Sequence, residues 1–191
     1  MSRALPADLC PPRALGLRSG TVRLRTSDPR WKSAFAAERR RIARAWPTRM
    51  LRIEHIGSTA IAGVRAKPIL DLAIQVPQLR PLRPLLETLT RLGYAYRGLY
   101  GLRGRHFFTL GTPVTHHLHL VQTTSPHWRR WLLFRDYLRA NPREAHSYDA
   151  LKQSLAIRFR HDRDSYTRAK TAYVEHVLRK ARATEKMRVH C

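Results

Sequence analysis

The chain has 191 residues, the size of one domain and enough to bury a sizeable core. Its 37 basic residues, 31 of them arginine, outnumber 13 acidic residues and give a net charge of +24. No apolar run approaches the roughly 18 residues of a membrane span, no signal peptide is evident, and Cys10 and Cys191 alone cannot form a disulfide framework or a zinc site. We therefore expect a cytoplasmic protein with no membrane partner.

The charge predicts an anionic partner. Between Glu87 and Asp136 there is no acidic residue. The same stretch contains Arg91, Arg97, Arg103, Arg105, Arg129, Arg130 and Arg135. Two interpretations stay open: a surface for RNA or DNA, or an arginine-rich composition whose cations are merely solvated. Because no run of five cations, RGG repeat or known nucleic-acid module occurs, a small anionic ligand is favoured over nucleic acid.

The first half of the chain predicts a helix followed by strands. Residues 1–20 are expected to be a disordered leader, and residues 21–24 a short edge strand. Asp28 and Pro29 are typical of a helix start, and Pro47 ends that helix. Strands are then predicted over 51–57, 68–76, 94–97, 105–110 and 115–122, with a helix over 81–92 and a hairpin turn at 111–113.

The second half predicts helices only. They are expected at about 127–140, 142–159 and 162–182, followed by a frayed tail over 183–191. A mixed β-sheet with helices packed on one face and a helical C-terminal half is an α+β fold. Residues 21–182 are expected to form this single domain.

Strand alternation places three polar side chains on one face. In the strand over 68–76, Leu70, Leu72, Ile74 and Val76 share the apolar face, so Asp71 points to the other. In the strand over 115–122, Leu118 and Leu120 alternate with His117 and His119 in the same way. One carboxylate and two imidazoles on an open face suit a divalent-metal or an acid–base site. The alternative is that hydrogen bonds or solvent satisfy both histidines.

The turn Gly57-Ser58-Thr59 follows a predicted strand. It offers backbone N–H groups and two hydroxyls without bulk, which suits a phosphate. The alternative is an ordinary helix N-cap. Lys67, just before the acidic strand, could neutralise phosphate charge or simply be solvated. Neither GxxxxGK[ST], GxGxxG nor GxSxG occurs, so P-loop, dinucleotide-binding and nucleophile-elbow functions lack support.

Three blocks resemble the GrpB family: EHIGSTAIAGVRAKPILDLAI over 54–74, HLHLV over 117–121, and FRDYLRANPREAHSYDALKQSLAIRF over 134–159. Asp162, Arg163, Tyr166, Thr167 and Lys170 continue the third block. The resemblance spans about residues 21–182 and implies a nucleotidyltransferase-like fold. In that superfamily a Gly-Ser turn and carboxylates on neighbouring strands bind magnesium and a triphosphate. Family members fused to dephospho-CoA kinase suggest nucleotide or coenzyme A metabolism.

The resemblance implies roles for several residues. Gly57, Ser58, Thr59 and Lys67 would bind phosphate or nucleotide; Asp71 and His119 would be catalytic; Asp71, His117, His119 and Glu54 would hold Mg²⁺ or Mn²⁺. The chain departs from the superfamily at Ala73, where a second carboxylate is usual. Either a different metal site forms, or the protein binds its ligand without transfer chemistry. Because Glu54 and His55 alternate, only one of them can share the face of Asp71.

Overall fold

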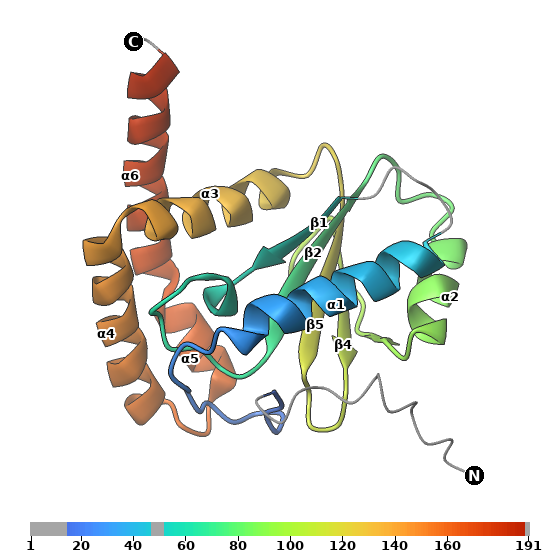
Figure 1. Cartoon of the computed structure of the whole chain (residues 1–191), viewed down its shortest axis with the longest axis horizontal. Helices are drawn as coiled ribbons and strands as arrows, with labels where there is room; N and C mark the ends of the chain where they lie inside the picture. Colours follow the sequence, from blue (N-terminus) through green and yellow to red (C-terminus); the bar gives the residue numbers. More distant parts are fainter. Residues whose placement is uncertain (1–14, 47–51, 190–191) are drawn as a thin grey trace.

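One five-stranded mixed sheet forms the centre of the computed structural model, which describes residues 15–46 and 52–189 (Figure 1). The strands are β1 (Arg52–Ile56), β2 (Leu70–Val76), β3 (Ala95–Tyr96), β4 (Arg105–Leu110) and β5 (His116–Gln122). Their order is β1-β2-β5-β4-β3, with β2 and β5 parallel and the other neighbours antiparallel. The mixed sheet confirms the predicted α+β class.

Within the described residues, six α-helices and one short 3₁₀ helix flank the sheet. They are α1 (Arg30–Ala45), η2 (Ser58–Ala60), α2 (Arg83–Arg91), α3 (Pro126–Ala140), α4 (Pro142–Arg158), α5 (Arg163–Ala169) and α6 (Thr171–Val189). The helices α1 and α2 lie over one face of the sheet, whereas α3 to α6 gather beside β1, and the C-terminal end of α6 projects beyond the other elements (Figure 1). No helix within the described residues combines the length and apolar character needed to cross a bilayer.

The two faces of the sheet have different surroundings. On one face, Leu72, Ile74 and Leu118 are fully buried against Trp31 and Ile42 of α1. The prediction that these rows of leucine side chains form the core is therefore confirmed. On the opposite face, a smaller cluster joins Ala73 and Val121 to Trp128 of α3. This helix covers only part of that face, which leaves the polar residues of β2 and β5 beside an open space.

The segment before α1 differs from the prediction. Residues 21–24 were expected to form an edge strand, but they form none. The amide of Val22 donates to the carbonyl of Arg160 (2.9 Å), and that of Arg25 donates to Ala66 (2.8 Å). Because these partners belong to separate segments, no continuous ladder forms.

Part of the predicted leader lies against the domain. The amide of Gly16 donates to the carbonyl of Pro68 (2.8 Å), and Leu17 is buried and bridges to Val114. Residues 1–14 lie outside the described residues. At the other end, the helix predicted over 162–182 is two helices, α5 and α6, and α6 continues to Val189 through most of the predicted tail.

Candidate functional site

The parallel pairing of β2 and β5 brings Asp71, His117 and His119 together. Asp71 pairs with His117 in the register and Ala73 with His119, so all three side chains share one face, as strand alternation predicts. His117 Nδ1 lies 2.9 Å from Asp71 Oδ1, and His119 Nε2 lies 3.9 Å from the same oxygen. The carboxylate is therefore flanked by two imidazoles.

An arginine stands behind each imidazole. Arg163 lies 2.9 Å from His117 Nε2, and Arg105 lies 3.4 Å from His119 Nδ1. An arginine stays protonated and only donates, so the imidazole nitrogen facing it must accept. The other nitrogen then carries the hydrogen. Both histidines consequently direct an N–H group toward Asp71.

The ionisation states agree with this arrangement. Burial raises the pKa of Asp71, but the hydrogen bond from His117 and the nearby N–H group of His119 outweigh burial and hold the pKa well below its usual value. Burial lowers the pKa of both histidines, against the pull of Asp71. At neutral pH the centre is thus one carboxylate between two neutral imidazoles.

Gly57 allows the turn after β1 to touch this carboxylate. Its φ of +69° and ψ of −173° lie in a region that only glycine occupies freely. A Cβ atom there would lie 2.5 Å from Asp71 Oδ2. The turn expected to hold phosphate therefore begins at a glycine, because a side chain there would collide with Asp71. Ser58 and Thr59 follow this glycine and line the pocket.

Basic side chains from several segments close the pocket. This pocket, of about 270 Å³, is lined by the Gly57–Thr59 turn, Asp71, both histidines and five cationic side chains. Those cations are Lys67, Arg105, Lys152, Arg163 and Lys170. The only acids among the lining residues are Asp71 and Asp164. The pocket therefore carries an excess of positive charge, which suits an anion.

The three pocket lysines share a depressed basicity. Burial, then nearby cations including Arg163 and Lys170, lower the pKa of Lys67 to about 7. The same two causes lower the pKa of Lys152 to about 7 and that of Lys170 to about 8. Each ammonium group is held close to others of its own sign, with too little negative charge nearby to offset it.

Two tyrosines support these lysines. The ring of Tyr166 is close to both Lys67 and Lys170, whose nitrogens are 5.8 and 4.3 Å from its centroid. The ring of Tyr148 lies 5.2 Å from the nitrogen of Lys152, which also donates to the carbonyl of Arg65. Cation–π contacts of this kind hold an ammonium group without neutralising it.

Sequence reasoning did not assign the helical residues to the site. A signal was present in their spacing: Tyr148 and Lys152 are four apart, and Arg163, Tyr166 and Lys170 are three and four apart. Such spacing puts side chains on one helical face. Nothing in the sequence tells which element that face contacts.

Glu54 takes a different place from the one predicted. The antiparallel pairing of β1 puts it opposite Ala73, on the face of Asp71. However, Glu54 does not line the pocket, because Arg135 of α3 binds its carboxylate at 2.7 Å. His55, on the other face, stacks on Phe35 and bonds to the hydroxyl of Thr59 at 2.9 Å.

The donor set does not fit the metal site expected from the sequence. Glu54 is engaged by Arg135, and the nitrogens of His117 and His119 that face Asp71 carry hydrogen rather than a free lone pair. Within the described ranges, no three His, Cys, Asp or Glu side chains are grouped to hold an ion. The carboxylates that line the pocket are Asp71 and Asp164, and the imidazole nitrogens that face Asp71 add no ligand to them, so these side chains form no cage for Mg²⁺ or Mn²⁺.

The mixed sheet and the helices around it form an α+β fold that solved structures share. A crystal structure of the Cid1 poly(U) polymerase has this fold: its TM-score is 0.50 at 19% identity, over 71% of this chain and 44% of that one. The family model "GrpB protein" matches residues 21–180, and the chain belongs to the GrpB family.

Individual relatives agree with this membership. A UPF0157 protein of Pseudomonas aeruginosa is 37% identical over 183 residues, which cover 91% of this chain and 75% of the relative. The crystal structure of GrpB from Enterococcus faecalis has a TM-score of 0.77 at 33% identity, over 83% of this chain and 96% of that one. A dephospho-CoA kinase of Mycolicibacterium paratuberculosis is 30% identical, and the match covers 84% of this chain and 46% of the kinase.

Proposed function

We propose that the pocket binds a nucleotide or a phosphorylated, coenzyme-like small molecule. The observation that carries this proposal is the convergence of Lys67, Lys152 and Lys170 on one small space. Their lowered pKa values mean that each cation is incompletely compensated in the free protein. A phosphate group supplies the missing negative charge, and Ser58 supplies a hydroxyl donor beside it.

Binding is proposed to be independent of a divalent metal. In the nucleotidyltransferase class, magnesium offsets triphosphate charge between carboxylates. Here the cationic side chains outnumber the carboxylates in the pocket. The lysines and Arg163 would therefore take the role of offsetting charge, with Asp71 left to accept a hydrogen bond from a ligand hydroxyl.

Isothermal titration calorimetry tests the proposal. ATP, ADP, dephospho-CoA and pyrophosphate would be titrated into the full chain in EDTA and again with Mn²⁺. Lys170→Met removes one charge-assisted hydrogen bond, worth about 1.5–3 kcal/mol, so the Kd should rise roughly tenfold or more. Lys32→Met, at an exposed position of α1, is the matched control and should change nothing. No binding at millimolar ligand, or an equal effect of both variants, would refute the proposal.

A second candidate function is phosphoryl or nucleotidyl transfer. The ionised Asp71 at the centre of the pocket favours it, because a carboxylate next to a bound phosphate can act as a general base. Asp71 would take the proton of an attacking hydroxyl, that oxygen would bond to phosphorus, and the leaving oxygen would depart with its electron pair. His119, whose Nε2–H group points at the same carboxylate, would orient Asp71 for this proton transfer.

Product formation separates the two candidates. Purified protein would be incubated with ATP and an alcohol acceptor or water, and nucleotide products would be resolved by chromatography. Turnover that Asp71→Asn removes, while ligand binding persists, indicates an enzyme. Ligand binding without turnover in the wild-type chain indicates a non-catalytic binding module.

A further inference from the structure

Two larger cavities continue from the small pocket across the surface. The first, of about 830 Å³, shares Tyr100, Phe107 and Arg163 with the pocket and adds Arg18 and Arg97. The second, of about 740 Å³, shares Arg18 and Pro113 with the first, and adds Arg23, Arg25 and Arg160. The shared residues show that the two cavities adjoin, and together they are here called the arginine groove.

The charged side chains of the groove are all basic. No aspartate or glutamate occurs among the residues that line its two cavities. None of its arginines forms a salt bridge within the described part of the chain. By contrast, Arg129 and Arg130 on α3 pair with Glu185 and Glu175 of α6. The net positive charge is therefore uncompensated along the groove.

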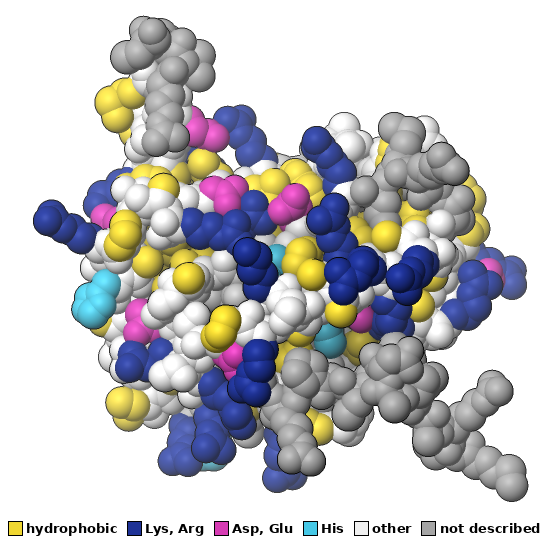
Figure 2. Space-filling model, viewed as in Figure 1, with side chains coloured by type: hydrophobic (Ala, Val, Ile, Leu, Met, Phe, Trp, Pro, Cys, Tyr) yellow, Lys and Arg dark blue, Asp and Glu magenta, His cyan; other side chains and the backbone are white. Residues whose placement is uncertain are grey.

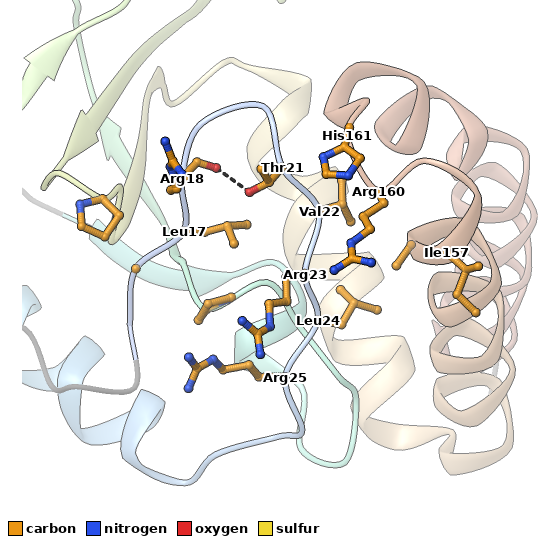
Figure 3. A pocket seen from close by; sticks show the side chains of 14 residues that line it. Leu17, Arg18, Thr21, Val22, Arg23, Leu24, Arg25, Ile157, Arg160 and His161 are labelled. Atoms are coloured by element: carbon orange, nitrogen blue, oxygen red, sulfur yellow. Dashed lines mark hydrogen bonds between the residues drawn. The ribbon is translucent and has the colours of Figure 1, made fainter.

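The space-filling view shows how unequal the charges are: Lys and Arg side chains are spread widely over the face shown, and Asp and Glu are few (Figure 2). In the close view of the second cavity, Arg160 from the turn after α4 points toward the extended segment that carries Arg23, and both residues line the cavity (Figure 3). Apolar side chains, including Val22 and Ile157, line the same cavity. Such a surface offers positive charge to the anionic backbone of a ligand and apolar contact to the edges of its rings.

An exposed aromatic ring stands where the groove meets the pocket. Tyr100 is 57% exposed and stacks on Phe107, with ring centroids 5.0 Å apart and an interplanar angle of 28°. Its φ of +44° is unfavourable for a residue with a side chain. Arg105 holds this conformation by donating to the carbonyl oxygens of Leu99 and Tyr100 at 3.0 and 2.7 Å. Strained backbone of this kind clusters at binding sites.

We propose that the arginine groove binds single-stranded nucleic acid, with one base stacked on Tyr100 and the following phosphates along Arg97, Arg18 and Arg160. A basic groove joined to an aromatic platform is the arrangement by which proteins bind single strands, because every base has a face that can stack. A single strand is required because a base must leave its duplex stack to cover the ring. One end of the strand would then lie at the small pocket.

Fluorescence anisotropy of labelled oligo-U and oligo-dT twelve-mers tests this inference with the full chain. Counterion release predicts that log Kd rises with log salt by about 0.7 per phosphate contact, so three or four contacts give a slope between about 2 and 3. Tyr100→Gly, which also relieves the backbone, should weaken binding at least fivefold, and Tyr100→Phe should restore it. Arg97→Ala combined with Arg160→Ala should lower both the affinity and the slope.

Arg179→Ala combined with Arg182→Ala, at exposed positions of α6, removes the same charge away from the groove and is the matched control. An equal loss of affinity in both double variants would overturn the proposal, because it would show binding to the overall charge. Absence of a salt slope, or undiminished binding in Tyr100→Gly, would overturn it too. So would equal competition by inorganic polyphosphate of the same length, because that ligand has no base to stack.

This inference is independent of the proposed function. Arg97 and Arg160 do not line the small pocket, so their variants should bind ATP as the wild-type chain does. Retained ATP binding also shows that those variants are folded. Oligonucleotide binding without ATP binding would refute the proposed function alone, and the reverse result would refute the groove alone.

Discussion

Replacing Gly57 with alanine should damage the protein in two separable ways. The Cβ atom would lie 2.5 Å from Asp71 Oδ2 and 3.0 Å from Asp71 Cβ and Cγ. The carboxylate cannot easily rotate away, because its other oxygen is held by His117 at 2.9 Å. In addition, a φ of +69° with a ψ of −173° is a conformation that alanine adopts only under strain.

Both costs can be bounded. A residue forced into this part of conformational space loses about 1–3 kcal/mol. An extra methyl group in a filled space costs about 1–3 kcal/mol more. Gly57→Ala should therefore lower the free energy of unfolding by about 2–6 kcal/mol. The second cost depends on the neighbouring acid, so part of it should disappear when Asp71 is shortened.

Urea unfolding of Gly57→Ala, Asp71→Ala and the double variant measures this. The double-mutant cycle should give a favourable coupling of about 1–3 kcal/mol, because Asp71→Ala removes the carboxylate that the methyl group meets. The backbone strain should remain in the double variant. If Gly57→Ala lost less than about 0.5 kcal/mol, or if the two changes were simply additive, the close approach of turn and acid would be refuted.

Three further predictions concern buried charge. Glu38 is 8% exposed and lies 2.6 Å from Arg41. Glu38→Ala should lower the free energy of unfolding by about 3 kcal/mol, because it leaves Arg41 without its carboxylate partner. A loss under about 1 kcal/mol in urea unfolding would contradict this. Burial lowers the pKa of His55 and His116 to about 4, so stability should fall as the pH drops below the unfolded value of 6.5. Between pH 7 and pH 5 each histidine should cost about 2 kcal/mol, and His116→Gln should halve the combined loss in urea unfolding. A bound phosphate should raise the pKa of Lys170 from about 8, so the protein should take up protons when it binds phosphate at pH 8. The binding enthalpies measured by calorimetry in Tris and in HEPES should then differ, because the two buffers release protons with different enthalpies. Equal enthalpies would contradict this prediction.

Sequence reasoning succeeded where a short-range rule controls the structure. The two-residue period of a strand is fixed by geometry, so Leu70, Leu72 and Leu118 identified the core face and left Asp71, His117 and His119 on the other. The α+β class followed in the same way from the order of periodic segments. The parallel pairing of β2 and β5 and its register were not predicted, because they depend on how distant segments pack.

The features that the sequence did not predict depend on contacts between residues far apart in the chain. Glu54 lies on the predicted side of the sheet, but its carboxylate belongs to Arg135, which is 81 residues later. Lys152 and Lys170 enter the pocket only because α4 and α5 dock beside the sheet. The segment 21–24 lacks a strand because its amides find two different acceptors, and such tertiary choices override local propensity.

The order of the pocket residues along the chain has a consequence during synthesis. All five strands and the Gly57 turn lie before residue 123, whereas Lys152, Arg163 and Lys170 follow it. Domains generally form from the N-terminus as the ribosome releases them. A nascent chain that ends near residue 125 therefore contains the whole sheet and the acid but few of the cations that surround it. The translated polypeptide gains all the residues that line the pocket only after α4, α5 and Lys170 have been made.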